Sequence, residues 1–207
     1  MMFVILNAWM IAIIHTAMRH SKEEKAASHE RIVAIAAARI RESGTEQPGV
    51  AEIMRAAGLT HGGFYKHFGS RDELIAEAVK RALNDGESKV PELTAGEDPP
   101  AAFADAYLST AHRDEPATGC GVVALGTDMP RVGGPAQEAY RAQVERYLAH
   151  LEQLMEDDDD EATRGRATVT LSAMVGAVMI ARALGPTRRS DEILRDVREA
   201  IRERRLL

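Results

Sequence analysis

The fold of this chain is decided by residues 50–68, which read VAEIMRAAGLTHGGFYKHF. Apolar residues at helical spacing predict a short first helix with one buried face, and they are Ile53, Met54 and Ala57. Gly58 follows them, and glycine readily takes the left-handed conformation that ends a helix. Leu59 is placed to fill the corner, and the hydroxyl of Thr60 is expected to cap a second helix. The pattern predicts a helix-turn-helix.

The second helix of this pair is suited to enter a groove of DNA. It has no acidic residue to repel phosphates, and two adjacent glycines smooth its leading edge. Phe64 and Phe68 are expected to pack into the core of the small domain, whereas the other side chains are either DNA contacts or ordinary exposed surface. The residues expected to contact DNA are small, aromatic or basic: Gly49, Thr60, His61, Gly62, Gly63, Tyr65, Lys66, His67 and Arg71.

This ordered set of features resembles the TetR family of bacterial transcriptional regulators. The match lies in the Glu52-Ile53 pair, the turn at residues 57–60, the segment 63–68, and Ser70-Arg71-Asp72-Glu73-Leu74, and it spans roughly residues 19–83. Gly49 departs from the family, which more often has Ser or Thr there, but glycine is an acceptable N-cap.

The resemblance implies an all-α fold with an N-terminal three-helix helix-turn-helix domain and a C-terminal helical ligand-binding and dimerisation domain. It also implies a cytoplasmic homodimer that binds a palindromic operator in double-stranded DNA. Such a protein is expected to act as a repressor that a small apolar effector releases. The sequence does not distinguish repression from activation.

Composition and charge agree with this reading. The chain has 207 residues, of which 4% are aromatic and 28% charged, as expected for packed helices. Its net charge of −6 is unevenly divided. Residues 18–83 contain 11 Lys and Arg against 9 Asp and Glu, whereas residues 84–207 contain 15 against 23. The negative excess therefore belongs to the second part and does not oppose DNA binding by the first.

The first 17 residues form an apolar tail without any charged side chain. A helix of this length would be about 25 Å long, short of the ~30 Å hydrocarbon core of a bilayer. The tail has no basic leading region of the kind that a signal peptide carries. We expect translation to begin at Met18 and the tail to be spurious or disordered. A membrane-tethered DNA binder is the alternative.

The remaining chain is expected to form a DNA-binding domain at residues 18–84 and a ligand-binding and dimerisation domain at residues 85–207. Gly44 should end the first helix, and Ser70 and Glu73 should form a capping box for the connecting helix. The acidic run at residues 157–161 marks a turn or a helix start. Helices are expected at 22–43, 70–85, 101–113, 135–156, 162–184 and 190–205, with a linker at 91–100 and a glycine-rich interruption at 119–134.

An apolar ligand pocket is expected beside the glycine-rich interruption, where helical packing is broken. Its candidate residues lie on several predicted helices and are Phe103, Tyr107, Cys120, Tyr140, Tyr147 and Met174. For any single one of them, a place in an ordinary core is the alternative. Cys120 is the lone cysteine, so it is either a small buried hydrophobe or a thiol that senses oxidants or electrophiles.

Dimerisation is expected through the last two helices, because residues 162–184 are too apolar all round for a solvent-facing helix. The alternative is that both helices pack inside one subunit. The expected interface residues are Val169, Ala173, Gly176, Ala177, Ile193, Val197 and Ile201. The sequence contains no catalytic motif, no metal-ligand spacing and no cofactor fingerprint, so we expect no enzyme activity, metal or cofactor.

Overall fold

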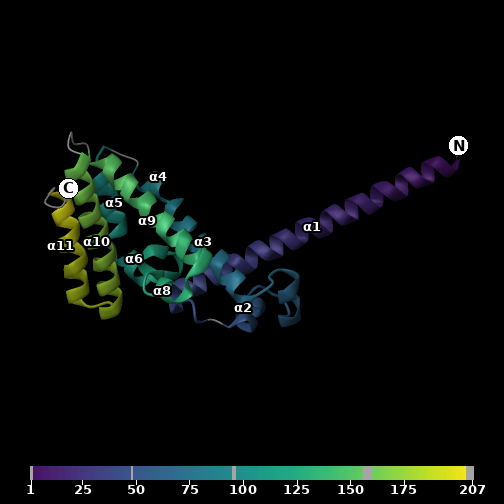
Figure 1. Cartoon of the computed structure of the whole chain (residues 1–207), viewed down its shortest axis with the longest axis horizontal. Coiled ribbons are helices and arrows are strands. Elements are labelled where there is room, and N and C mark those ends of the chain that lie inside the picture. Colours follow the sequence, from purple (N-terminus) through teal and green to yellow (C-terminus); the bar gives the residue numbers. More distant parts are fainter. Residues whose placement is uncertain (1, 48, 95–96, 156–159, 204–207) are drawn as a thin grey trace.

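The backbone is helical and contains no strand within the described residues (Figure 1). This computed structural model describes residues 2–47, 49–94, 97–155 and 160–203, with the backbone alone for residues 2–21 and 160. The elements in chain order are α1 Met2–Ser43, α2 Val50–Ala56, the 3₁₀ helix η1 His61–Lys66, α3 Arg71–Glu87, α4 Val90–Leu93, α5 Pro99–Tyr107, α6 Thr110–Asp114, the 3₁₀ helix η2 Pro116–Thr118, α7 Gly121–Leu125, α8 Met129–Val132, α9 Gly134–Leu154, α10 Asp160–Leu184 and α11 Arg188–Arg202.

The N-terminal domain folds as the apolar pattern predicts. Ile53 and Met54 of α2 are buried in one hydrophobic core with Phe64 and Phe68. The buried side of α1 belongs to the same core and consists of Ile32, Val33, Ala36, Ala37 and Ile40. Gly58 takes a φ of +73°, which confirms its place just beyond the end of α2. The guanidinium Nε of Arg31 donates to the carbonyl of Ala57 at 3.0 Å and so ties the turn to α1. These contacts hold the turn in place and so fix the orientation of η1 relative to α1 and α2.

Helix ends follow local chemistry where the sequence supplies a cap. Gly44 has a φ of +83° and ends α1, as expected. The Ser70 hydroxyl accepts from the Glu73 amide at 3.1 Å, which confirms the N-cap. The carboxylate of Glu73, however, accepts from the amide of Gly69 rather than from that of Ser70. The expected cap by the Thr60 hydroxyl is wrong, because that side chain makes no capping hydrogen bond to η1.

Other expected boundaries need correction. Within the expected linker at residues 91–100, the structure forms most of α4 and the first two residues of α5. The expected helix at 101–113 is two helices, α5 and α6, because the backbone leaves helical geometry at Leu108. The glycine-rich segment, expected to form at most one short helix with loops, holds two short helices, α7 and α8. Most of the acidic run at residues 157–161 lies outside the described residues.

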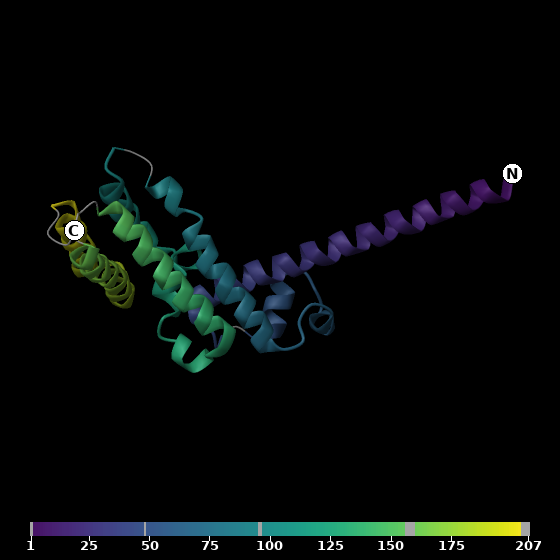
Figure 2. The same ribbon diagram turned by 45° about the horizontal axis from the view of Figure 1, so that its top comes forward.

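The larger part of the molecule is assembled on α3. In Figure 2, the green helix α9 runs along the teal helix α3, and α10 and α11 lie together at the end opposite the N-terminus. α3 also packs on α1, so a single helix joins the DNA-binding part to the rest. The expected domain boundary at residue 84 falls inside this helix.

Buried arginines fix the short elements between these long helices. Arg113 of α6 donates to the Ser190 hydroxyl and the Asp191 carboxylate at 2.6 and 2.5 Å, which ties α6 to the start of α11. Its neighbour Asp114 accepts from the same guanidinium, which holds the pKa of Asp114 below its usual value. α6 is thereby attached to the helix pair α10 and α11.

The first helix is longer than predicted. It begins at Met2 rather than near Lys22, so the backbone of residues 2–17 is helical and projects from the body (Figure 1). The expected translation start at Met18 remains a prediction. Among the described residues, one helix, Glu161–Leu184, is long and apolar enough to cross a membrane, and a third of its most apolar 18-residue window is buried inside the protein. A core helix meets the same criterion.

Candidate nucleic-acid interface and ligand cavity

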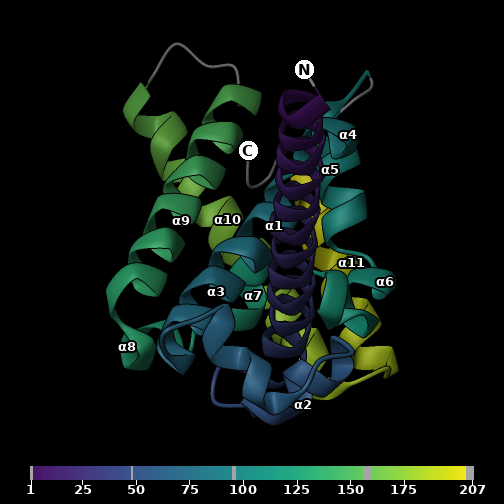
Figure 3. The same ribbon diagram turned by 90° about the vertical axis from the view of Figure 1, so that its right-hand side faces the viewer.

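The helix-turn-helix lies at one end of the molecule, where α2 sits below the ends of α1 and α3 (Figure 3). Phe64 and Phe68 anchor η1, because their rings are buried and stack at a centroid distance of 5.5 Å. The opposite side of η1 is open to solvent. Its Tyr65 is 75% exposed, and His61, Gly62 and Lys66 are exposed as well. The element is a 3₁₀ helix, not the α-helix that the apolar pattern suggested.

The other expected DNA contacts have different surroundings. Gly49 is the exposed N-cap of α2, and Thr60 is exposed at the start of η1. Gly63 is half-buried beside the side chain of Met54. Arg71 is turned toward the loop after α1, where its Nη2 donates to the carbonyls of Thr45 and Glu46 at 2.6 and 2.9 Å. Its role at the DNA backbone stays a prediction.

His67 lies at the edge of the domain core. Its ring is half-buried and tilted against His29 at a centroid distance of 6.0 Å. Burial lowers the pKa of His67, and the neighbouring His29, Lys25 and Lys66 lower it further. The ring is therefore neutral at neutral pH and would meet DNA as a hydrogen-bonding group and not as a cation.

Lys66→Ala is expected to weaken binding to all DNA sequences and to flatten the salt dependence of binding. The physical reason is the loss of one phosphate-neutralising cation, which lowers the number of counterions released. Fluorescence anisotropy over a salt series measures the slope, with Lys80→Ala on the exposed surface of α3 as the matched control. An unchanged slope for Lys66→Ala would remove this residue from the interface.

A cavity of about 250 Å³ lies in the larger part of the molecule, between the end of α3, α4, α5, α6, η2 and α9. Four of the six expected pocket residues line it: Phe103, Tyr107, Cys120 and Tyr147. A smaller apolar recess shares Val90, Phe103, Tyr107 and Tyr147 with it and extends to Leu151, Leu154 and Leu171. The structure thus offers an apolar cavity with a polar end and, next to it, a much smaller apolar recess of about 10 Å³.

The other two expected pocket residues do not line the cavity. The Tyr140 hydroxyl donates to the Val122 carbonyl at 2.9 Å, and burial raises the pKa of Tyr140 to about 12. Met174 is fully buried in the core. Both residues were chosen for their chemistry and predicted helix, but neither feature shows which way a side chain points.

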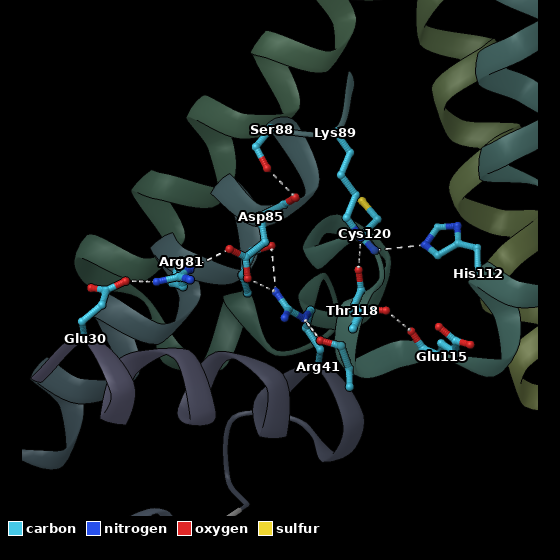
Figure 4. Close-up of polar contacts among 12 residues, drawn as sticks. Glu30, Arg41, Arg81, Asp85, Ser88, Lys89, His112, Glu115, Thr118 and Cys120 are labelled. Carbon is cyan, nitrogen blue, oxygen red and sulfur yellow. Dashed lines mark hydrogen bonds and ion pairs between the residues drawn. The ribbon is translucent and has the colours of Figure 1, made fainter. Parts of the chain in front are cut away.

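His112 organises the polar end of the cavity, although the sequence analysis assigned it no role. Its Nδ1 lies 2.7 Å from the Tyr107 carbonyl, and the Cys120 amide donates to its Nε2 at 3.0 Å (Figure 4). Accepting at Nε2 makes the ring the neutral Nδ1–H tautomer. Burial lowers the pKa of His112 to about 4, and the cations of Arg182 and Lys89 act in the same direction.

Two buried donors near this end have no nitrogen or oxygen partner among the described residues. The Tyr107 hydroxyl has no nitrogen or oxygen partner although the residue is only 7% exposed, and its hydrogen-bonding neighbour is the Cys120 thiol, a weak partner. The Nε of Arg182 is also unpaired. An unsatisfied buried donor costs about 1–3 kcal/mol. Burial raises the pKa of Tyr107 well above its usual value, with a further contribution from Cys120, so its hydroxyl stays protonated and able to donate.

Close backbone approach at two glycines shapes the cavity. A Cβ at Gly119 would lie 2.5 Å from the Nη2 of Arg182, and a Cβ at Gly86 would lie 2.9 Å from the Tyr147 hydroxyl. Gly86 stands inside α3, where glycine disfavours the helix. A glycine within a predicted helix is the sequence signal that could have indicated the close contact between Gly86 and Tyr147. No signal in the sequence joins Arg182 to a segment 70 residues earlier.

No group of three or more potential metal-ligating side chains is found in the part of the chain that the structure describes. His112 and Cys120 meet through a backbone amide and do not form a metal-ligand pair.

Comparison with known proteins agrees with the geometry. Residues 32–78 match the family of bacterial regulatory proteins, tetR family. A TetR transcriptional regulator from Chloroflexus aurantiacus J-10-FL is 25% identical, with a TM-score of 0.73 over 87% of this chain and 97% of that chain. A TetR-family regulator from Agrobacterium tumefaciens is 20% identical, with a TM-score of 0.72 over 86% and 98% of the two chains. No curated protein matches the sequence.

The matched segment holds the whole helix-turn-helix, from the C-terminal part of α1 to the middle of α3. The solved structures extend the similarity over most of the larger helical part as well. Residues 32–78 therefore form a DNA-binding domain of the tetR family, and the chain as a whole has the fold of TetR-family transcriptional regulators.

Proposed function

We propose that this protein is a cytoplasmic homodimeric repressor that binds a palindromic operator and is released by a small apolar effector. The observation that carries the proposal is the cavity of about 250 Å³, because it lies against the same helix, α3, that packs on the DNA-binding domain. A ligand in this space would favour one arrangement of α3 and hence one spacing of the two recognition elements in a dimer.

The outer face of α10 supports a dimer. Four large apolar side chains are exposed there: Val169, Met179, Ile180 and Leu184. Small residues lie between them, and a Cβ at Gly165 or Gly176 would meet nothing within 4 Å. An apolar face with small residues allows close packing against a second copy, and two-fold symmetry then suits a palindromic site.

The expected interface residues divide into two groups. Val169 is exposed, and Ala173, Gly176, Ile193 and Val197 are partly exposed. Ala177 and Ile201 are buried within their own subunit, so they serve its core and do not face a partner. For Ala177 of α10 and Ile201 of α11, the structure fits the alternative expectation that these helices pack within one subunit.

Contacts around Arg41 offer a route from the cavity to the DNA-binding domain. The guanidinium of this α1 residue donates to the Ala117 carbonyl of η2 at 2.6 Å and to the Asp85 carboxylate of α3 at 3.0 Å (Figure 4). The next residue of η2, Thr118, lines the cavity and accepts from Lys89 at 2.8 Å. Movement of η2 by a ligand would act directly on α1 and α3.

The operator test uses DNA fragments that flank the gene, with retention measured before and after addition of candidate effectors. An effector that releases the DNA should itself bind more weakly to the DNA-bound protein, by the same factor, which is typically about 5- to 150-fold. An effector that displaces the protein but binds equally well with and without DNA would contradict the mechanism. Failure to retain any inverted repeat would contradict operator binding.

Arg41→Met is expected to uncouple effector and DNA. The substitution removes the contacts with Ala117 and Asp85 but leaves the cavity lining and η1 unchanged. Effector and DNA should each still bind, while the ratio of the effector affinities without and with operator falls toward one. Titration of effector in the presence and absence of operator measures this ratio, with Arg39→Met on the exposed side of α1 as the control. Unaltered coupling in Arg41→Met would place the route elsewhere.

A regulator that responds through a thiol is the second candidate. The observation in its favour is that Cys120 lines the cavity, with its sulfur 3.9 Å from the Tyr147 hydroxyl. Cys120→Ala separates the two candidates. Release of DNA by an effector should survive this substitution in our proposal and should be lost if the thiol is the sensor.

A further inference from the structure

The ligand chemistry can be inferred from the hydrogen-bonding groups that the cavity leaves unused. Most polar groups at its lining are already engaged. The Ser109 hydroxyl donates to the Ala106 carbonyl at 2.8 Å, both ring nitrogens of His112 are taken, and Lys89 donates to the Thr118 carbonyl. What remains is the Tyr107 hydroxyl, a buried group that lines the cavity and has no nitrogen or oxygen partner among the described residues, only the weakly hydrogen-bonding Cys120 thiol beside it.

Arg182 adds a positive charge at the same end. Its Nη2 donates to the His112 carbonyl at 2.8 Å, and its Nε has no partner. No ion pair joins it to an acidic side chain within the described residues, and burial lowers its pKa. Its guanidinium lies next to Gly119, a residue that lines the cavity, since a Cβ at Gly119 would stand 2.5 Å from the Nη2 of Arg182.

Both unused groups are donors, and one of them is charged. A neutral acceptor would satisfy the tyrosine but leave the arginine without a counter-charge. An anion would satisfy both, since hydrogen bonds to charged partners in a buried site are the stronger ones. Among the described residues, Glu115 is the only acidic side chain that lines the cavity, and it is exposed.

The walls beyond this polar end are apolar. Phe103 and Tyr147 lie in both the cavity and its recess, which continues to Leu154 and Leu171. A ligand that fills this space needs a compact apolar body. We propose that the effector is an apolar organic acid whose carboxylate accepts from the Tyr107 hydroxyl and faces Arg182. This inference rests on the proposed function, because it names the ligand of the same cavity.

The test compares acids with amides of the same shape by isothermal titration calorimetry on the full chain. The probes are 3-phenylpropionate with 3-phenylpropionamide, and hexanoate with hexanamide. Each acid should bind about tenfold or more tightly than its amide, which corresponds to about 1.4 kcal/mol. Equal binding of acid and amide, or no binding of either acid, would overturn the proposal.

Variants assign the preference to the two donors. Arg182→Gln should reduce the acid-to-amide ratio to about twofold or less, while Arg182→Lys should retain it because the charge remains. Tyr107→Phe should weaken the binding of acid and amide alike, since both offer an acceptor. Tyr140→Phe and Arg131→Gln are matched controls outside the cavity and should change neither. A full preference in Arg182→Gln would contradict the role of this residue.

Two further readings separate this inference from the proposed function. Without ligand, Tyr107→Phe should melt no lower than the original chain, because it removes an unsatisfied hydroxyl; a lower melting temperature would mean that the hydroxyl has an internal partner and would overturn the argument. An acid that binds with the expected preference but leaves operator affinity unchanged would contradict the effector role alone. Release of operator by a neutral compound and not by the acids would contradict the ligand class alone.

Discussion

The free energy of unfolding should fall by about 3 kcal/mol as pH decreases from about 6.5 to about 4, through His112 alone. Its pKa is near 6.5 in the unfolded chain and about 4 in the folded protein. Between these values the unfolded state binds the extra proton, so protonation favours unfolding. The contribution is fully present above pH 6.5, is lost as pH falls through this window, and is constant below it.

Chemical denaturation at several pH values checks this result. His112→Gln should flatten the pH dependence in the window, because an amide can still accept from the Cys120 amide but does not titrate. The exposed His61→Gln is the control and should keep the original slope. Below about pH 4, further loss of stability has another source. The pKa of Asp114 is lowered in the folded protein, so the stability that its carboxylate contributes is lost only below the pH window of His112. Equal slopes in the original chain and His112→Gln would contradict the assignment.

Ile180→Asp should convert the proposed dimer into monomers. The side chain is 46% exposed on the outer face of α10, so a carboxylate there is tolerated by the separate subunit. In a two-fold interface the same carboxylate would be buried twice, and each unpaired buried charge costs several kcal/mol. The dimer dissociation constant should therefore rise by at least about a hundredfold. Sedimentation velocity across a concentration series measures this change.

Operator binding gives a second reading of the same variant. Monomers engage only one half-site, so affinity for an inverted repeat should fall together with dimerisation. The control is Ala142→Asp, which places the same charge at an exposed position of α9. A dimer that persists in Ile180→Asp with unaltered dissociation would exclude this face as the interface.

The helix-turn-helix was predictable because its information is local. Gly58 ends α2, Ser70 caps α3, and the apolar spacing of Ile53, Phe64 and Phe68 selects the buried face, all within 20 residues. The exception is the type of helix at η1. Thr60 makes no capping bond there, and residues 61–66 form a 3₁₀ helix whose Phe64 ring stacks on Phe68.

The cavity was predictable only in part. Aromatic residues near a glycine-rich break pointed to Phe103, Tyr107, Cys120 and Tyr147, and the structure brings these four together. Tyr140 was indistinguishable from them in the sequence, although its hydroxyl turns to the Val122 carbonyl. The direction of a side chain depends on the rotation of its helix against its neighbours, which the order of residues does not specify.

The sequence by itself determined the family of the DNA-binding domain, the helical class and the position of the helix-turn-helix, because caps, turn glycines and apolar spacing act over a few residues. Only the tertiary structure decided which polar groups remain unused. Tyr107 and Arg182 come from helices far apart in the chain, and His112, which packs edge-on against the Tyr107 ring at 4.7 Å, joins them. Whether a buried donor is satisfied depends on every element packed around it, so this property exists only in the folded chain.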